Sequence, residues 1–256
     1  MALRLILVAV LTGATAVAGR AQAPPSAPLM VFAASDLGPP FAQIVPLFES
    51  QTPTHVTLVL GSTGMLAQQI RNGAPADVFF AANESFIKDL TAEKLTLPGT
   101  NALYARGRIA TATLKSNGIR INNLADLADA RIRRIAIANP QHAPYGLAAK
   151  QALQAAGLWT TLEPKLVFGE NVQQAVQFVR SGSAEAGIVA RSVVNTSDLE
   201  WKLVDDTLHT PLDQGASVMA RTKQPAASRS FIAFVNGVQG RLVMRQFGFL
   251  LPAESL

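Results

Sequence analysis

The sequence contains no cysteine and only three histidines, at positions 55, 142 and 209. The lack of cysteine excludes a disulfide scaffold, thiolate zinc or iron–sulfur sites, a cysteine nucleophile and a cysteine-linked lipid anchor. The histidines are well separated in the sequence, which disfavours a histidine-based metal site. We therefore expect neither a bound metal cation nor a cofactor.

Charge is also scarce, because only 15% of the 256 residues are charged, against roughly 25% in an ordinary soluble domain. The apolar fraction of 49% is ordinary, which excludes a disordered chain and permits one large or two small domains. The net charge is +5, with no run of five or more Lys or Arg and only two Trp and two Tyr. No nucleic-acid partner is therefore expected.

The amino terminus has the pattern of a secretory signal peptide, in which Arg4 precedes the apolar run Leu5–Ala18. This run is too short to span a bilayer, and no later run has the required length. Small residues permit cleavage at three positions, after Ala18, Ala21 or Ala23. We assign residues 1–23 to the signal peptide and expect a periplasmic protein whose net charge falls to +3 after cleavage at either of the last two positions.

Short apolar runs alternate with helical patterns along the rest of the chain. The runs that we predict as strands are 29–34, 55–60, 77–81, 103–114, 134–138, 165–168, 187–189, 201–204 and 216–220. The predicted helices are 41–50, 65–71, 84–93, 147–156 and 171–180, with one or two more in 228–247. This alternation is typical of an α/β protein with parallel strands.

No repeat or low-complexity linker marks a domain boundary. The only segments suited to a crossover between two domains are the long strand after Leu103 and the polar stretch 205–214. With both as crossovers, one lobe is discontinuous, comprising 29–108 and 216–256, and the second lobe, 109–215, is inserted into it.

Four strand-to-helix turns are rich in small or hydroxyl residues: FAASD at 32–36, LGSTG at 60–64, ANPQHAPYG at 138–146 and FGENV at 168–172. Such turns lie at the carboxyl ends of parallel strands, where ligands bind and helix N-termini present unpaired N–H groups. The hydroxyls of Ser35, Ser62 and Thr63 add further donors. A single turn of this kind is usually only a helix cap. Four of them together predict an anion site built from neutral donors.

Enzyme motifs are poorly matched. GSTG at 61–64 lacks the spacing of the G-x-S-x-G nucleophile elbow and the lysine of a Walker loop. A serine hydrolase that uses Ser35 or Ser62 with one of the histidines stays as an alternative. We expect the protein not to be an enzyme.

Six segments carry a resemblance to a known family: AASDL at 33–37, GSTGMLAQQI at 61–70, GAPADVFFAA at 73–82, NPQHAPYGLAAKQAL at 139–153, LEPKLVFGENVQQAV at 162–176 and AEAGIVA at 184–190. In this order they resemble the periplasmic molybdate-binding proteins of ABC transporters, from about Leu29 to Leu251. The resemblance implies a type II periplasmic binding protein, with two α/β lobes and a hinged cleft. The implied ligand is molybdate or tungstate, passed to a membrane permease, and we expect a monomer.

The resemblance also implies the binding residues. Ser35 supplies the first donor, with the backbone of Asp36 as an additional one. In the second turn the hydroxyl donor is Thr63 or its neighbour Ser62. Tyr145 supplies a backbone N–H, and Val172 supplies another at the start of the next helix.

One departure concerns Ala190, which stands where many family members have a tyrosine hydroxyl. A lost charge-assisted donor costs roughly 1.5–3 kcal/mol, or about 10- to 150-fold in affinity. Tyr145 or water could replace it. Otherwise the same fold binds another anion or a small organic acid. On this basis Ala190→Tyr is expected to tighten molybdate binding.

A cleft that offers only donors suits molybdate, a dianion around neutral pH, whereas a protonated phosphate would leave its O–H without an acceptor. The carboxylates of Asp36 and Glu170, which adjoin donor turns, are therefore expected to point away from the anion. Because donors come from both lobes, binding is expected to close the hinge.

Overall fold

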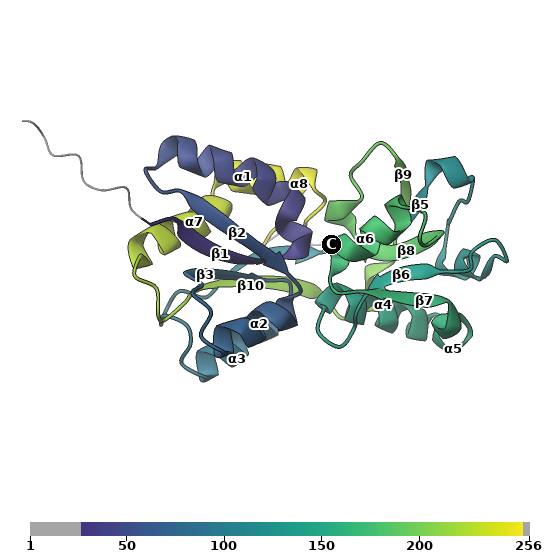
Figure 1. Ribbon diagram of the computed structural model, residues 1–256, viewed down its shortest axis with the longest axis horizontal. Coiled ribbons are helices and arrows are strands. Elements are labelled where there is room, and N and C mark those ends of the chain that lie inside the picture. Colours follow the sequence, from purple (N-terminus) through teal and green to yellow (C-terminus); the bar gives the residue numbers. More distant parts are fainter. Residues whose placement is uncertain (1–26, 253–256) are drawn as a thin grey trace, which may run out of the picture.

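The computed structural model describes residues 27–252, which form two α/β lobes side by side (Figure 1). Each lobe is built on a five-stranded sheet that has helices on both faces. The predicted signal peptide and its three candidate cleavage sites lie outside the described residues. The prediction of a two-lobed α/β protein is confirmed.

The sheet of the first lobe has the strand order β2-β1-β3-β10-β4. β1 is parallel to β2 and β3, whereas β10 is antiparallel to β3 and β4. The strands are β1 (Leu29–Ala34), β2 (Val56–Gly61), β3 (Val78–Ala81), β4 (Ala102–Gly107) and β10 (Leu212–Val218). The helices are α1 (Gly38–Gln51), α2 (Thr63–Arg71), α3 (Glu84–Ala92), α7 (Pro225–Val235) and α8 (Val238–Gln246).

The sheet of the second lobe has the order β7-β6-β8-β5-β9, in which β6 is parallel to β7 and β8, and β5 is antiparallel to β8 and β9. The strands are β5 (Ile109–Leu114), β6 (Ile135–Ala138), β7 (Leu166–Gly169), β8 (Ala186–Ala190) and β9 (Leu199–Leu203). The helices are α4 (Pro144–Ala155), α5 (Trp159–Leu162) and α6 (Val172–Arg180), and two short 3-10 helices, η1 (Ser35–Leu37) and η5 (Arg191–Val193), face each other between the lobes.

Within residues 27–252, the chain passes from one sheet to the other twice. The predicted strand 103–114 is in fact two strands, which separate at Arg108 because β4 pairs with β10 while β5 pairs with β8 and β9. The second passage lies between β9 and β10. The strand predicted at 216–220 is misplaced: it begins at Leu212, opposite Gly107, and ends at Val218. The residue ranges of the two lobes stay a prediction.

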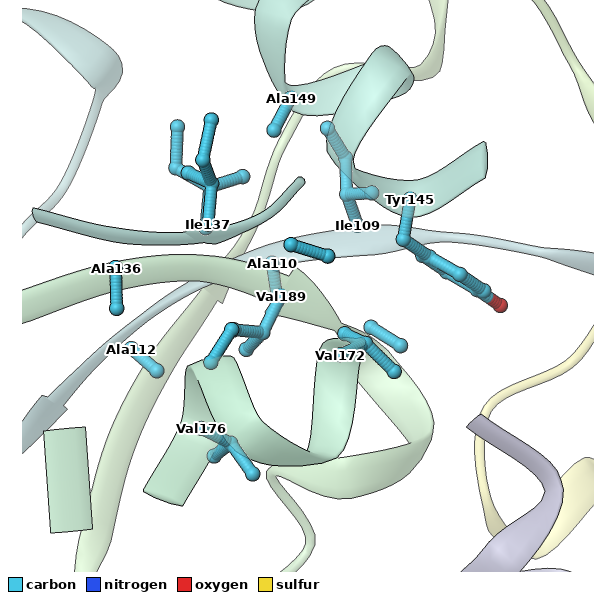
Figure 2. Packing of buried hydrophobic residues seen from close by; sticks show 14 of the residues in the cluster. Ile109, Ala110, Ala112, Ala136, Ile137, Tyr145, Ala149, Val172, Val176 and Val189 are labelled. Carbon is cyan, nitrogen blue, oxygen red and sulfur yellow. The ribbon is translucent and has the colours of Figure 1, made fainter. Parts of the chain in front are cut away.

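Each lobe has its own apolar core. Four phenylalanines of the first lobe, Phe41, Phe48, Phe80 and Phe231, pack edge to face, with ring centroids 5.1–5.7 Å apart. In the second lobe the sheet is rich in alanine, so helices α4 and α6 pack closely onto it. Figure 2 shows this core, with Tyr145 at its margin and the tyrosine hydroxyl directed away from the packed aliphatic side chains. One polar group of the second lobe is thereby presented to the first.

Candidate functional site

The five residues predicted to bind the ligand, Ser35, Ser62, Thr63, Tyr145 and Val172, line one small pocket between the lobes. The pocket measures about 10 Å³, which is about the smallest cavity that holds one water molecule. No lysine, arginine or histidine lines it. Larger hollows, such as one of about 400 Å³ beside Met30, are not lined by any of these five residues. The pocket therefore suits a compact ligand held by neutral groups.

The first turn follows β1, where buried Ser35 begins η1. The second lobe holds this turn at two backbone carbonyls. Gln173 Nε2 donates to Ser35 O at 3.2 Å, and the Ser192 hydroxyl donates to Asp36 O at 2.8 Å. Because both carbonyls are bonded from across the pocket, the position of Ser35 depends on the approach of the two lobes.

The second turn precedes α2 and contains both alternative hydroxyl donors. Ser62 stands at the N-cap, but its side chain makes no capping bond; its Oγ lies 2.7 Å from His142 Nδ1 in the other lobe. Thr63 Oγ1 instead accepts a hydrogen bond from Ala82 N at 3.0 Å. An accepted bond leaves the hydroxyl hydrogen of Thr63 available to a ligand, whereas Ser62 shares its hydroxyl with an imidazole.

The third turn leads into α4, which begins at Pro144, so the Tyr145 N–H belongs to the first helical turn and has no partner within the helix. The Tyr145 hydroxyl donates to Asp36 Oδ2 at 2.9 Å and accepts from Gln214 Nε2 at 2.8 Å. The hydrogen of this hydroxyl is therefore bonded to Asp36, and the group that Tyr145 can offer to a ligand is its backbone N–H.

The fourth turn precedes α6. The Asn171 side chain caps this helix, accepting from the N–H groups of Gln173 at 3.0 Å and Gln174 at 3.1 Å. The N–H of Val172, the first residue of the helix, stays outside this cap. It adds a fourth donor at the positive end of a helix dipole.

Asp36 is among the residues that line the pocket, and the direction of its carboxylate stays a prediction. The residue is fully buried, and its Oδ2 accepts hydrogen bonds from the pocket residue Tyr145 at 2.9 Å and from Nε2 of Gln214, which does not line the pocket, at 2.9 Å. Burial raises the pKa of this carboxyl from 3.8 to about 6, although the bonds from Gln214 and Tyr145 lower it. Glu170 differs, since 63% of its side chain is exposed.

The carboxylate belongs to a buried network that sequence reasoning missed. Tyr104 Oη donates to Gln214 Oε1 at 2.7 Å, and Gln214 Nε2 donates in turn to Asp36 Oδ2 and to the Tyr145 hydroxyl oxygen. Burial raises the pKa of both tyrosine hydroxyls well above 10, so they remain donors. No local sequence motif marks Gln214 and Tyr104, because each forms its hydrogen bonds with residues more than 60 positions away in the chain.

Ala190 is fully buried at the end of β8 and does not line the pocket. It belongs to the core of the second lobe, where a tyrosine would have to displace its neighbours. Within residues 27–252 no cluster of three or more His, Asp or Glu could hold a metal ion. Over the same range, no helix is both long and apolar enough to cross a bilayer.

Comparison with known proteins identifies the family. Residues 29–250 match the family described as bacterial extracellular solute-binding protein. The molybdate-binding protein ModA of Azotobacter vinelandii is 34% identical over 97% of this chain and 99% of its own, and that of Rhodobacter capsulatus is 31% identical over 93% and 95%.

Structural similarity agrees with the sequence. The solved structure of the Azotobacter vinelandii periplasmic molybdate-binding protein superposes with a TM-score of 0.82 and 31% identity, covering 88% of this chain and 99% of that one. The resemblance to molybdate-binding proteins is thus confirmed. The chain belongs to the family of bacterial extracellular solute-binding proteins.

Proposed function

We propose that this protein captures molybdate or tungstate in the pocket between its lobes and delivers the anion to the permease of an ABC transporter. The observation that carries the proposal is the convergence of four strand-to-helix turns on one small pocket free of cationic side chains. The relatives named molybdate-binding proteins, which span nearly the whole chain, support the same ligand.

The proposed donors are neutral. They are the hydroxyls of Ser35 and Thr63, with Ser62 as the alternative, and the N–H groups of Tyr145 and Val172. Helix N-termini and hydroxyls in a water-poor pocket stabilise a dianion without a lysine or arginine. An anion with oxygens directed to both lobes draws the lobes together, and the closed form is what a permease recognises.

The hinge of this movement consists of Arg108 and the segment 204–211, because only there does the described chain pass from one sheet to the other. We further propose that residues 1–23 are a signal peptide, that the protein works as a monomer in the periplasm, and that it catalyses no reaction.

One observation favours a second candidate, a serine hydrolase. Ser62 Oγ and His142 Nδ1 lie 2.7 Å apart, the distance of a nucleophile and its base. His142 Nε2, however, is 3.9 Å from Glu170 Oε2, too far for a hydrogen bond that orients the imidazole. Hydrolysis of a generic ester, abolished by Ser62→Ala, would support the hydrolase.

Isothermal titration of the mature protein with molybdate, tungstate, sulfate and phosphate tests the proposed function. We expect heat and tight binding with molybdate or tungstate, and weaker binding with sulfate and phosphate, because relatives that span nearly the whole chain are named molybdate-binding proteins. No heat with either molybdate or tungstate would refute the proposal, whereas tighter binding of phosphate or sulfate would reassign the ligand within the same fold.

A further inference from the structure

Tyr145 lies in the first turn of α4 in the second lobe, yet its hydroxyl bonds to two residues of the first lobe. It donates to Asp36 Oδ2 at 2.9 Å and accepts from Gln214 Nε2 at 2.8 Å. Asp36 belongs to η1, which follows β1, and Gln214 belongs to β10. All three residues are buried. The hydroxyl is therefore a polar connection between the lobes that is shielded from water.

The other donors to the Asp36 carboxyl belong to the first lobe. Gln214 Nε2 donates to Oδ2 at 2.9 Å, and the backbone N–H groups of Asp36 and Leu37 also bond to the carboxyl. Gln214 is itself held by Tyr104 of β4, whose hydroxyl donates to Gln214 Oε1 at 2.7 Å. Separation of the lobes leaves these bonds in place, because the groups that form them stay together. Among the described residues, the Tyr145 hydroxyl is thus the donor that the Asp36 carboxyl loses on opening.

Gly107, the last residue of β4, leaves the space that the Tyr145 hydroxyl occupies. A Cβ atom at position 107 would overlap the hydroxyl oxygen and would lie 2.7 Å from Gln214 Nε2. Gly107 does not have a positive φ angle, so its backbone conformation does not require glycine. The next residue is Arg108, where the chain leaves the first sheet. The hydroxyl therefore lies directly against the start of the hinge, in a space that a larger residue would fill.

Tyr145 also contributes to the pocket, because its backbone N–H is one of the proposed donors to the ligand. An anion held by this N–H and by the Ser35 hydroxyl draws the lobes together, and closure brings the phenol to Asp36. When the lobes separate, water takes the place of each partner in the bond between Tyr145 and Asp36. Inside the closed protein this bond has a carboxylate acceptor and no competing water, which makes it one of the stronger kinds of hydrogen bond.

We infer that the Tyr145 hydroxyl is a latch, which bonds to Asp36 when the lobes close and holds the Tyr145 N–H in position against the anion. The inference rests on the proposed function and assigns a positioning role to a second group of one binding residue. The latch stabilises only the closed form, because the open protein, which the anion enters first, lacks the bond. Removal of the hydroxyl should therefore raise the dissociation rate constant and leave the association rate constant nearly unchanged.

Stopped-flow kinetics of the mature protein with sodium molybdate tests the latch in Tyr145→Phe, which keeps the ring and the backbone N–H but lacks the hydroxyl. Tyr104→Phe is the matched control, because it removes a buried tyrosine hydroxyl of the same network whose bond to Gln214 lies within the first lobe. Gly107→Ala is a second route to the same effect, since its Cβ displaces the Tyr145 hydroxyl and leaves both tyrosines in the chain.

Closure can be followed directly in the same proteins. The chain contains no cysteine, so two introduced cysteines can be labelled with a pair of dyes without a competing thiol. Ala92→Cys at the end of α3 and Ala155→Cys at the end of α4 place one dye on each lobe, at exposed positions. Energy transfer between the dyes then reports the closed fraction at saturating molybdate, which a purely structural role of the hydroxyl would not change.

We expect the dissociation rate constant to rise about 10- to 150-fold in Tyr145→Phe, and in the same direction in Gly107→Ala, with a smaller closed fraction in both. Tyr104→Phe should keep the rate constants of the wild type. An unchanged dissociation rate constant in Tyr145→Phe, or an equal rise in Tyr104→Phe, would overturn the inference while molybdate binding stands. Urea unfolding checks that each variant is folded, and Gly107→Ala decides the outcome if Tyr145→Phe is not. Failure of the wild type to bind molybdate would instead refute the proposed function.

Discussion

The backbone N–H of Gly64 donates a hydrogen bond to the carbonyl of His142 at 2.9 Å, which joins α2 of the first lobe to the loop before α4 of the second. A Cβ atom at position 64 would lie 2.7 Å from that carbonyl oxygen, closer than van der Waals contact allows. Glycine is therefore what lets the two lobes meet at the edge of the pocket.

Gly64→Ala is expected to hold the lobes apart and to weaken oxyanion binding. Overpacking costs about 1–3 kcal/mol, which corresponds to about 5- to 150-fold in the dissociation constant. The free energy of unfolding of the ligand-free protein should not fall, because the collision arises between lobes and not within one. Titration calorimetry and urea denaturation measure the two quantities. Met65→Ala, at an exposed neighbour on α2, is the control, and equal affinities in both variants would contradict the prediction.

Thr63→Val should reduce the affinity for molybdate about 10- to 150-fold, because it removes a hydroxyl whose hydrogen is available to a dianion. Thr63→Ser keeps the hydroxyl and should restore most of the affinity. Ser62→Ala should have a smaller effect, since the Ser62 hydroxyl is shared with His142. Titration of the three variants decides between the two hydroxyls; a larger loss in Ser62→Ala would reverse the assignment.

Asn171→Ala should lower both stability and affinity. Loss of the α6 cap costs about 1 kcal/mol of stability and releases the first helical turn, which carries the Val172 N–H. Asn83 caps α3 in the same way, accepting from Ser85 N at 2.8 Å, but does not line the pocket. Asn83→Ala should therefore lose similar stability in urea denaturation while keeping its affinity for molybdate. If both variants bind equally well, the cap of α6 has no part in binding.

Asp36 should make the ligand-free protein less stable at neutral than at acidic pH. Its pKa rises from 3.8 to about 6 on folding, so its stabilising contribution is full below the lower value and is lost as the pH rises through the higher one. A rise of this size corresponds to about 3 kcal/mol. The free energy of unfolding of Asp36→Asn, relative to wild type, should accordingly increase between about pH 4 and about pH 8. A constant difference across this range would show that Asp36 titrates normally.

Ala190→Tyr was expected, from the resemblance alone, to tighten binding. The structure changes the expected outcome, because Ala190 is fully buried in the core of the second lobe. The larger side chain should cost about 1–3 kcal/mol of stability through overpacking and should not improve affinity. Ala190→Ser is the control, because it adds only one oxygen atom and should disturb the packing less than the tyrosine does. Thermal unfolding and molybdate titration measure both effects, and tighter binding by the tyrosine variant would support the original expectation.

Local patterns were sufficient for much of the site. The turns that contain Ser35, Ser62 and Val172 could be recognised because a strand, a small-residue turn and a helix are adjacent in the chain. The turns of Ser35 and Ser62 lie together because β1 and β2 are parallel neighbours in one sheet. The turn of Val172 follows β7 of the other sheet, so only the placement of the two lobes brings it to the same pocket. The strand predicted at 103–114 was wrong because its alternating pattern continues across Arg108, and only the partner strands separate its two halves.

By itself, the sequence determined the α/β class, the family resemblance and the small, neutral residues of the strand-to-helix turns, because these depend on composition and on residues close together in the chain. Tertiary structure alone decided the burial and the side-chain partners of Asp36, since Tyr145 and Gln214 are 109 and 178 positions away. It also decided which hydroxyl is shared with His142. Burial and pairing across the cleft set the protonation of a carboxyl, and neither is encoded in the neighbouring residues.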